Sequence, residues 1–406
     1  MYNPIIIPLS VPNLSIDILD NVRETIETGW VSTGERFIQD FESKIAAYLG
    51  VDRAISCQTG TAGLHLALRV LGVEHGDEVI VPTLTFIAAV NPVKYVGAEP
   101  VFMDCDDTLN MDLDKLEQFL QHECNYIDGQ VINRKTNRFI KAIIAVHVFG
   151  NPINMQRLMA IKEKYNLKLI EDATEALGSF YLEGKYAGKY CGTIGDIGVY
   201  SFNANKIITT GGGGMIVSSS DMLLNEIVFF SAKTDPLYFF HDVIGYNNRM
   251  TNIQAAFGTD QIDRLEGFIE TKMRNYQLYK EAIAGIEGLE LLPFKADTRA
   301  NHWFYSVIVD REGYGLDRDE LLTKLHEANI QTRPLWGLIH KQKPYLESQG
   351  YRIEKAEWYE KNLINIPCSS NLTEYEIDIV MRCLNNFHKS LRRERVKEVV
   401  KERAII

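Results

Sequence analysis

The stretch that decides the fold is IGVYSFNANKIITTGGGG, residues 197–214. It begins with an apolar run at 197–202 that is typical of a strand, and it ends with four glycines at 211–214. Lys206 lies between the two, which is an unusual place for a surface charge. Lysine is the side chain that forms a Schiff base with a carbonyl compound when its surroundings lower its pKa. A solvated loop lysine is the simpler interpretation of this segment alone, so the rest of the chain has to separate the two.

Around this stretch, residues 55–230 alternate between strand-like and helix-like patterns. The strand candidates are continuous runs rich in β-branched residues, as expected for strands buried on both faces. Such alternation predicts an α/β fold with a large, mostly parallel sheet and helices on both faces, whose ligands bind at the carboxyl ends of the strands. The predicted strands are 78–81, 100–103, 143–146, 167–170, 197–202 and 215–217, and the predicted helices are 61–71, 85–95, 154–165 and 221–230.

The pattern changes in the last third of the chain, and two domains are predicted. A large domain over 1–285, which includes an N-terminal arm, precedes a smaller α+β domain over 286–391. The basic tail at 392–406 predicts a solvated terminal helix, with a membrane-surface segment as the alternative. The elements predicted here are a long helix at 250–285, a strand at 303–309, and helices at 318–328 and 375–391.

Composition restricts the class of function. The net charge of −11 over 406 residues argues against sequence-independent nucleic-acid binding, because neutralising phosphates requires a basic surface. Residues 1–9 do not have the pattern of a signal peptide, and no apolar run approaches the length of a membrane span. The six cysteines form no C-x-x-C pair, so neither a zinc site nor a disulfide framework is predicted. We therefore expect a cytoplasmic protein that binds no nucleic acid, membrane or metal.

The first motif with chemical meaning is TGTAG, residues 59–63, which leads into an apolar helical pattern. Thr61 is predicted to start the helix, and the glycines leave the first backbone N–H groups bare. Bare amides at the positive end of a helix dipole bind anions, and the threonine hydroxyl adds a donor. A capped helix after a glycine is also a common structural feature, so this motif does not decide the function alone.

The second motif is LIEDATEALG, residues 169–178. Glu171 and Asp172 end a predicted buried strand, and both are expected to face the ligand edge of the sheet. A cofactor whose ring nitrogen must stay protonated to act as an electron sink requires a carboxylate there, and Asp172 is placed to supply it. The alternative is that Asp172 caps the following turn.

An anion site, a strand-end aspartate and a candidate Schiff-base lysine thus occur in order at strand ends of one predicted sheet. Ser201, five residues before Lys206, adds a candidate phosphate donor. These are the requirements of pyridoxal 5′-phosphate, and their coincidence is far more specific than any single motif. The combination predicts that Lys206 forms the covalent link to this cofactor.

Short motifs spread over nearly the whole chain carry a family resemblance. They are PLS (8–10), WVSTG (30–34), FE (41–42), GTA (60–62), PTLTF (82–86), PVFMD (100–104), EDA (171–173), SF (201–202) with Lys206, and GYNNRM (245–250). The chain resembles the nucleotide-sugar aminotransferases of the DegT/DnrJ/EryC1/StrS type. The resemblance implies an aspartate-aminotransferase-like (type I) fold and a homodimer with active sites at the subunit interface.

The resemblance also implies cofactor roles position by position. Asp172 pairs with the ring nitrogen, Lys206 forms the covalent link and Phe86 stacks on the pyridine ring. Glu175 lies near the phenolic oxygen, where relatives often have Gln or His. The residues implied to hold the phosphate are Gly60, Thr61, Ala62 and Ser201 of one subunit and Asn247 of the other.

Within the family, PLSVPN (8–13) and TRPLW (332–336) with His340 look most like the branch that acts on 4-keto-6-deoxy-2-acetamido sugars, which feeds legionaminic acid and bacillosamine synthesis. The implied reaction takes the amine of L-glutamate, through pyridoxamine 5′-phosphate, to C4 of a nucleotide-linked keto sugar, with UDP as the expected nucleotide and bacterial surface glycan as the product's use. Amination at C3 of a 3-keto sugar is the enzymatic alternative. A non-catalytic regulatory relative is a further one, but it predicts the loss of Asp172 or Lys206, and both are present.

Three residues are candidate contacts for the sugar nucleotide: Arg333, Trp336 and His340. Arginine suits a diphosphate, and an aromatic ring can pack on the apolar face of a sugar. Ordinary packing and turn residues of the small domain are the alternative interpretation.

Overall fold

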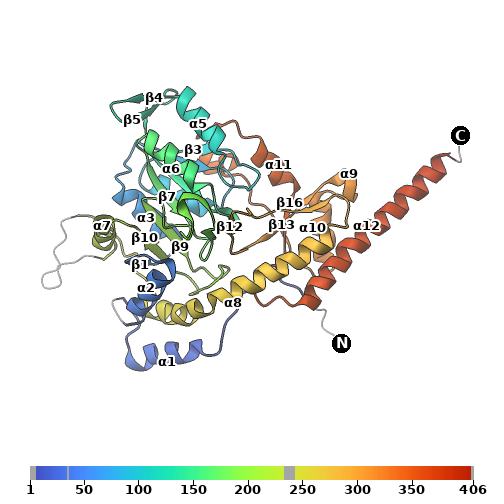
Figure 1. Cartoon of the computed structure of the whole chain (residues 1–406), viewed down its shortest axis with the longest axis horizontal. Helices are drawn as coiled ribbons and strands as arrows, with labels where there is room; N and C mark the ends of the chain where they lie inside the picture. The colour runs from blue at the N-terminus through green and yellow to red at the C-terminus, as the bar shows by residue number, and fades with distance from the viewer. Residues whose placement is uncertain (1–5, 34–35, 233–242, 404–406) are drawn as a thin grey trace.

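The computed structural model describes residues 6–33, 36–232 and 243–403, with side chains described as far as residue 392. A ten-stranded mixed sheet occupies the larger part of the molecule (Figure 1). Its strands are β1 (Ala54–Cys57), β2 (Glu78–Pro82), β3 (Glu99–Met103), β4 (Cys124–Ile127), β5 (Gln130–Asn133), β6 (Phe139–Val146), β7 (Lys168–Asp172), β9 (Ile197–Ser201), β10 (Gly214–Val217) and β15 (Gln349–Tyr351).

The main path of the sheet has the order β1-β10-β9-β7-β6-β2-β3-β15, and the β4–β5 hairpin joins β6 through β5. Strands β9, β7, β6, β2, β3 and β15 are parallel, whereas β10 is antiparallel to both β1 and β9. The central strands are buried along their length, as their continuous apolar runs predict. The predicted large, mostly parallel α/β sheet is therefore confirmed.

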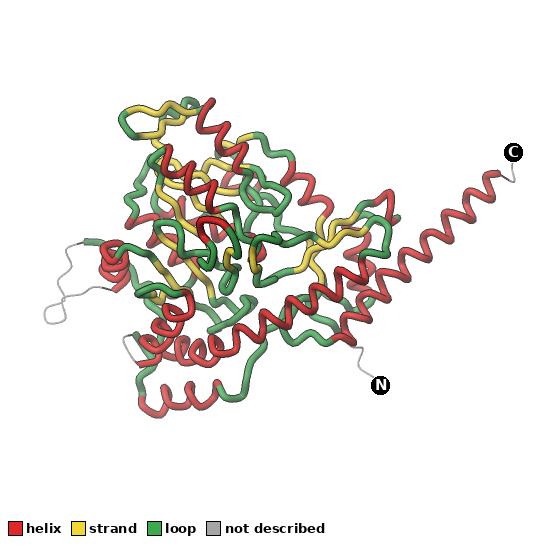
Figure 2. Tube along the Cα trace, viewed as in Figure 1, coloured by secondary structure: helices red, strands yellow, loops and turns green. Residues whose placement is uncertain are grey.

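Helices flank this sheet and connect it to the rest of the chain (Figure 2). Helix α3 (Gly60–Val70) packs on β7, β9 and β10. The long α8 (Asn252–Ile283) contacts α1 and α2 at one end and β11 (Leu289–Leu291) and α12 at the other. Helix α8 begins at a capping box between Thr251 and Gln254. The helices are α1 (Ile18–Thr28), α2 (Arg36–Leu49), α3 (Gly60–Val70), α4 (Asn91–Tyr95), α5 (Leu113–His122), α6 (Met155–Lys164), α7 (Asp221–Ala232), α8 (Asn252–Ile283), α9 (Arg311–Tyr314), α10 (Arg318–Glu327), α11 (Lys355–Asn362) and α12 (Glu374–Arg403).

A second, antiparallel sheet follows α8, with the order β11 (Leu289–Leu291), β13 (Tyr305–Val309), β16 (Leu363–Ile366) and β14 (Arg333–Pro334). Three pairings among the described residues cross the predicted boundary at residue 285. Strand β15 pairs with β3 of the large sheet, β12 (Thr298–Arg299) pairs with β8 (Phe180–Tyr181), and Ile7 forms a bridge with Ile330. The division into domains at 285 and 391 stays a proposal. Helix α12 continues without a break through residue 391 to Arg403, and residues 404–406 of the predicted tail lie outside the described part.

Two local predictions were wrong. The helix predicted at 85–95 is a 3-10 turn, η1 (Ile87–Ala89), followed by the short α4, because Pro92 in the first turn of α4 starts a new helix and cannot continue an earlier one. The helix at the TGTAG motif begins at Gly60 and not at Thr61. Thr59 has extended backbone angles and caps it, since its hydroxyl oxygen accepts the N–H of Ala62 at 3.0 Å.

Close packing brings the N-terminus of α3 to the strand ends. A Cβ atom on Gly63 would lie 2.7 Å from Cγ1 of Val199 on β9, so only glycine allows this approach of helix to sheet. A Cβ atom on Gly60 would lie 3.0 Å from the Cβ atom of Ser201. The first turn of α3 and the end of β9 therefore share one space at the carboxyl edge of the sheet. Among the described helices, none has both the length and the apolar character needed to cross a membrane.

Candidate active site

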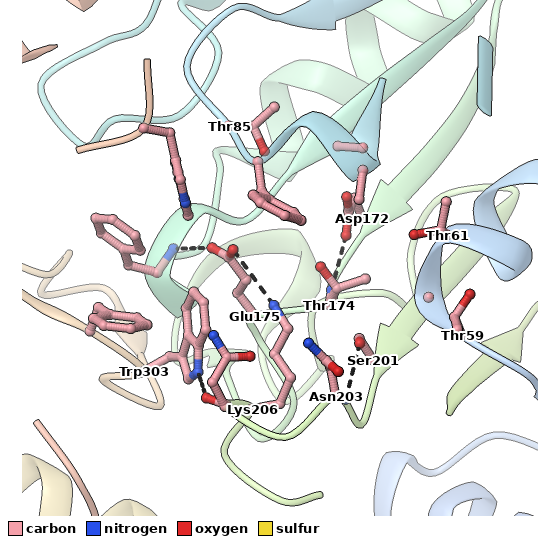
Figure 3. A pocket seen from close by; sticks show the side chains of 18 of the residues that line it. Thr59, Thr61, Thr85, Asp172, Thr174, Glu175, Ser201, Asn203, Lys206 and Trp303 are labelled. Atoms are coloured by element: carbon pink, nitrogen blue, oxygen red, sulfur yellow. Dashed lines mark hydrogen bonds and ion pairs between the residues drawn. The ribbon is translucent and has the colours of Figure 1, made fainter. Parts of the chain in front are cut away.

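A cavity of about 460 Å³ lies at the carboxyl ends of β7 and β9 (Figure 3). The two sheets both contribute to its walls, through Asp172 and Ser201 on one side and through Arg333 and Asn365 on the other. The sequence motifs had predicted this position for the site. The predicted residues that line the cavity are Gly60, Thr61, Phe86, Asp172, Glu175, Ser201, Lys206, Arg333 and Trp336.

Three predicted residues lie outside the cavity lining. Ala62 is in the first turn of α3, and its N–H is taken by the Thr59 cap. Asn247 is exposed on the segment between α7 and α8. His340 is half-buried, and its Nδ1 atom lies 2.6 Å from the hydroxyl of Thr83. The cavity of a single chain thus gives neither Asn247 nor His340 a direct place.

The amine of Lys206 lies inside the cavity, facing one carboxylate and one ring. Its Nζ atom is 3.7 Å from Oε1 of Glu175 and 4.1 Å from the centre of the Trp303 ring. Burial lowers the pKa of Lys206 below the ordinary value for lysine, although the charges of Glu175 and Asp172 oppose the shift. The environment therefore favours the free amine that covalent chemistry with a carbonyl group requires.

Backbone hydrogen bonds fix both ends of the loop that carries Lys206. Phe202 donates its N–H to Gly213 at 3.0 Å, and Thr210 donates its N–H back to Phe202 at 3.0 Å. The indole N–H of Trp303 donates to the carbonyl of Asn205 at 2.8 Å, directly before the lysine. Trp303 was predicted as the first residue of a strand, but β13 begins only at Tyr305, which leaves the ring free to cover Lys206.

Asp172 ends β7 and lines the opposite side of the cavity (Figure 3). Its Oδ1 atom accepts the N–H of Thr174 at 3.1 Å, so it does cap the turn, as one interpretation of the sequence proposed. Burial raises the pKa of Asp172, while the N–H and hydroxyl of Thr174 and the charges of Lys206 and His147 oppose the shift. A cationic N–H placed against this carboxylate would compensate for its burial.

Glu171 does not face the ligand edge, contrary to prediction, because successive strand residues point to opposite faces. Its carboxylate lies 3.0 Å from Nε2 of His147 and accepts the N–H groups of Gly192 at 2.8 Å and Ile194 at 2.7 Å. The pKa of Glu171 is lowered by His147 and the backbone donors despite its complete burial. Glu171 therefore supports the loop at 192–195 behind β7.

The remaining walls differ in character. At one end, the first turn of α3 meets the hydroxyls of Thr59, Thr61 and Ser201, and helix N-termini leave backbone N–H groups without intrahelical acceptors. At the other end, aromatic rings form an apolar wall. The Phe149 ring lies 5.0 Å from Trp336 and 5.6 Å from Phe304, centre to centre.

The sequence motifs did not identify Phe149, Trp303 or Phe304 as site residues. Phe149 follows β6 directly, so the rule that placed Asp172 at a strand end could have found it. No comparable signal marks Trp303 or Phe304, because the chain reaches them from the second sheet.

These residues fit pyridoxal phosphate. A Cβ atom on Gly60 would crowd Ser201 and Thr174 at 3.0 Å, so glycine keeps room beside Ser201 at a helix N-terminus, where a phosphate is favoured. Asp172 is a buried carboxylate that a protonated ring nitrogen would neutralise, and Lys206 is a buried amine on the same cavity. Phe86 lines the cavity with 53% of its surface exposed, so one face of its ring is available to a ligand.

The chain is similar to known proteins over nearly its whole length. The profile of the DegT/DnrJ/EryC1/StrS aminotransferase family matches residues 12–385. The chain is 36% identical to the GDP-perosamine synthase of Escherichia coli O157:H7, over 94% of this chain and 98% of that protein. It is 37% identical to the GDP-perosamine synthase of Caulobacter vibrioides, over 93% and 97%.

The fold is likewise that of a solved DegT DnrJ EryC1 StrS aminotransferase from Brucella abortus, with a TM-score of 0.82, 28% identity, and coverage of 91% of this chain and 95% of that one. Structures similar to this chain include one in a PLP form and one in a PMP form. The chain therefore belongs to the DegT/DnrJ/EryC1/StrS aminotransferase family, and it is a sugar aminotransferase that depends on pyridoxal phosphate.

Proposed function

We propose that the protein transfers the amino group of L-glutamate to C4 of a nucleotide-linked 4-keto-6-deoxy sugar. The observation that carries this proposal is the placement of the Lys206 amine in a cavity that also contains Asp172 and an aromatic wall. Amine transfer requires a buried lysine that can act as both nucleophile and base. Packing against Trp336 and Phe149 suits the apolar face of a sugar without a hydroxyl at C6.

Pyridoxal phosphate supplies an aldehyde that condenses with amines and a ring that accepts the electrons released when the α-proton of the donor leaves. The first turn of α3 and the hydroxyls of Thr61 and Ser201 would hold its phosphate. The carboxylate of Asp172 would accept the ring N–H and keep that proton in place. Phe86 would stack on the exposed ring face.

Lys206 then acts as the base in both halves of the reaction. With the cofactor bound, its Nζ atom would take up the proton that leaves the α-carbon of glutamate and hold it for return, and it would make the same transfers in reverse when the keto sugar is aminated. Trp303 covers the amine and Phe149 lines the same cavity, and these two rings keep water away from the reacting groups.

The second subunit is part of the proposal. Asn247 is exposed and lies outside its own chain's cavity lining, so we propose a homodimer in which it contacts the phosphate at the partner subunit's site. Equal mixing of an Asn247→Ala variant with a Lys206→Ala variant tests this. Because one of the two sites in a mixed dimer combines an intact lysine with an intact Asn247, activity reappears on mixing. Activity that stays at the level of the single variants contradicts shared sites.

Arg333 is the proposed binding residue for the nucleotide part of the substrate, because it is exposed and lines the cavity. A guanidinium group binds a diphosphate in two-point fashion. The motif resemblance predicted a UDP-linked 2-acetamido sugar, whereas the names of two relatives at 36% and 37% identity favour a GDP-linked sugar. Both sugars are 4-keto candidates, and C3 amination of a 3-keto sugar uses the same side chains.

The test is a panel assay. The purified protein is incubated with glutamate and with GDP-, UDP- and dTDP-linked 4-keto and 3-keto sugars, and the aminated carbon is identified by NMR. Amination at C4 of one of these sugars supports the proposal, and amination at C3 alone replaces it. Turnover of none of them, with cofactor bound and glutamate consumed in the first half-reaction, contradicts the substrate class. A cytoplasmic location and a role in surface-glycan synthesis stay predictions.

A further inference from the structure

The Glu175 carboxyl group stands between the amine of Lys206 and a backbone amide. One oxygen, Oε2, accepts the N–H of Phe149 at 2.8 Å, and the other, Oε1, is 3.7 Å from Nζ of Lys206. The two oxygens therefore have different partners: Oε2 is held by the backbone amide of Phe149, and Oε1 faces the amine of Lys206 (Figure 3). Glu175 is 4% exposed, so its carboxyl group is largely shielded from bulk solvent.

The backbone on both sides of the Phe149–Glu175 hydrogen bond is fixed by its surroundings. Phe149 has left-handed backbone angles (φ 56°, ψ 20°), which are uncommon for a bulky residue and persist only where the surroundings enforce them. The backbone of Glu175 is fixed too, because the side-chain amide of Asn301 donates to its carbonyl at 2.8 Å and to that of Leu177 at 2.9 Å. A side chain held at both ends keeps its free oxygen directed at Lys206.

The charges around this carboxyl group do not balance. The charged groups that face it are Lys206, from the loop after β9, and Asp172, from the end of β7, while η2 (Val148–Gly150) contributes only the amide and Trp303 only a neutral ring. His147 acts on Asp172 from behind β7. One ammonium cannot neutralise two buried carboxylates, so the cluster is stabilised by one further proton. Burial, with Asp172 nearby, raises the pKa of Glu175 to about 7.

We propose that Glu175 is the proton store of Lys206. In the forward step an N–H bond of the Lys206 ammonium breaks and an O–H bond forms at Oε1 of Glu175, which leaves a neutral amine beside a neutral carboxyl group. The reverse step restores the ion pair. No other bond changes and no oxidant is needed. Glu175 thus holds the proton of Lys206 while the lysine acts as an amine, and it returns that proton when the lysine must donate one.

This inference rests on Lys206 being the lysine of the proposed function, but it can be tested without the sugar and without turnover. In the full chain free of cofactor, acetic anhydride labels neutral amines, and mass spectrometry of the peptide with Lys206 reports the free-amine fraction from pH 5 to 10. Removing the carboxylate removes a stabilising partner of the ammonium. The Glu175→Gln variant should therefore label with a midpoint about one pH unit lower than the unchanged protein.

Turnover by the Glu175→Gln variant should be slower, although its Lys206 amine labels more readily. The amide side chain of the Glu175→Gln variant keeps an acceptor for the Phe149 N–H but cannot take a proton, so kcat should fall about a hundredfold with little change in KM for glutamate. A more reactive amine together with slower turnover separates a proton store from a packing role, which would not make the amine more reactive. Glu175→Asp, which restores a carboxyl group, should move the labelling midpoint back toward that of the unchanged protein.

The matched control is Glu78→Gln. Glu78 is a buried carboxyl group with a raised pKa, hydrogen-bonded to Asn133 at 2.7 Å and remote from the cavity lining, so its variant should keep the labelling curve of Lys206. An unchanged midpoint in a Glu175→Gln protein that melts cooperatively overturns the proton store. That result would not affect the role proposed for Lys206. The role of Lys206 is tested separately, by whether a Lys206→Ala protein loses covalent attachment of the cofactor.

Discussion

The Nζ atom of Lys206 lies 4.1 Å from the centre of the Trp303 ring, and the same indole ring is hydrogen-bonded to the residue that precedes the lysine. One side chain from the segment that leads into β13 of the second sheet therefore both covers the reactive amine and fixes the loop that presents it. This arrangement makes the second sheet part of the active site and not only a neighbour of it.

Replacing Trp303 with Leu should weaken both effects. Water would reach the amine, the pKa of Lys206 would rise toward its ordinary value, and the anchor at Asn205 would be lost. Because a smaller fraction of the lysine would then be the free amine, the expected fall in kcat/KM is about tenfold, which corresponds to about 1.4 kcal/mol. Trp358→Leu on α11, whose indole is half exposed, is the matched control. Equal kcat/KM values for the two variants would contradict the role of Trp303.

Replacing Asp172 with Asn should separate binding from chemistry. The amide keeps the size of the side chain but cannot hold a proton on the ring nitrogen, so kcat should fall about a hundredfold or more. The phosphate contacts at α3 are untouched, and the variant should still bind the coloured cofactor in an absorbance titration. A variant with near-normal turnover would show that this carboxylate does not act on the cofactor ring.

Glu175 should make the cofactor-free protein less stable as the pH rises. Its pKa is raised from 4.5 in the unfolded chain to about 7 in the folded chain, so the unfolded state binds fewer protons between these values and stability falls as the pH increases from 4.5 to 7. The difference amounts to about 3 kcal/mol. Thermal melting at pH 5 and pH 8 should thus show a smaller loss for Glu175→Gln than for the unchanged protein or for a variant of the exposed Glu347. A parallel loss in all three would contradict the raised pKa.

Asp104 should act with the opposite sign. This buried carboxylate accepts the N–H groups of Glu354, Lys355 and Ala356 at 3.0, 2.9 and 2.8 Å and pairs with Lys115, and these partners lower its pKa despite burial.

The ionised Asp104 stabilises the folded protein at pH values above the pKa of this group in the unfolded chain. This stabilisation is lost as the pH falls toward and below the lowered pKa of Asp104 in the folded chain. Asp104→Asn should lower stability at pH 7 by about 3 kcal/mol, and the deficit should shrink near pH 3. Asp107→Asn, which breaks only an exposed pair with Lys355, should melt within about 0.5 kcal/mol of the unchanged protein. A deficit of Asp104→Asn that does not depend on pH would contradict this account.

The elements that the sequence predicted best are those whose signals are local. The buried parallel strands are continuous β-branched runs, and the site motifs sit at their carboxyl ends, so Asp172 and Lys206 could be placed on one edge without coordinates. The missed elements depend on partners distant in sequence. Strand β15 is only three residues long and exists because it pairs with β3 across more than two hundred residues.

The errors at the site have the same origin. Thr59 and Thr61 are both able to cap a helix, but Thr59 is the one with extended backbone angles, and it forms a bridge with Gly213, which is distant in sequence. Glu171 and Asp172 are adjacent acids, and only the orientation of β7 decides that Glu171 meets His147 while Asp172 meets the cavity. Trp303 reaches Lys206 because α8 brings the second sheet back to the first, which no local pattern records.

The most direct test of the account is to identify which lysine bonds the cofactor. The protein is mixed with pyridoxal phosphate, reduced with borohydride and digested, and the modified peptide is sequenced by mass spectrometry. The account predicts a cofactor adduct on Lys206 and none in a Lys206→Ala protein. Lys272 is also fully buried with a lowered pKa, but it donates to the backbone carbonyls of Trp303 and Cys368 and does not line the cavity. An adduct on Lys272, or on any lysine other than Lys206, would contradict the account.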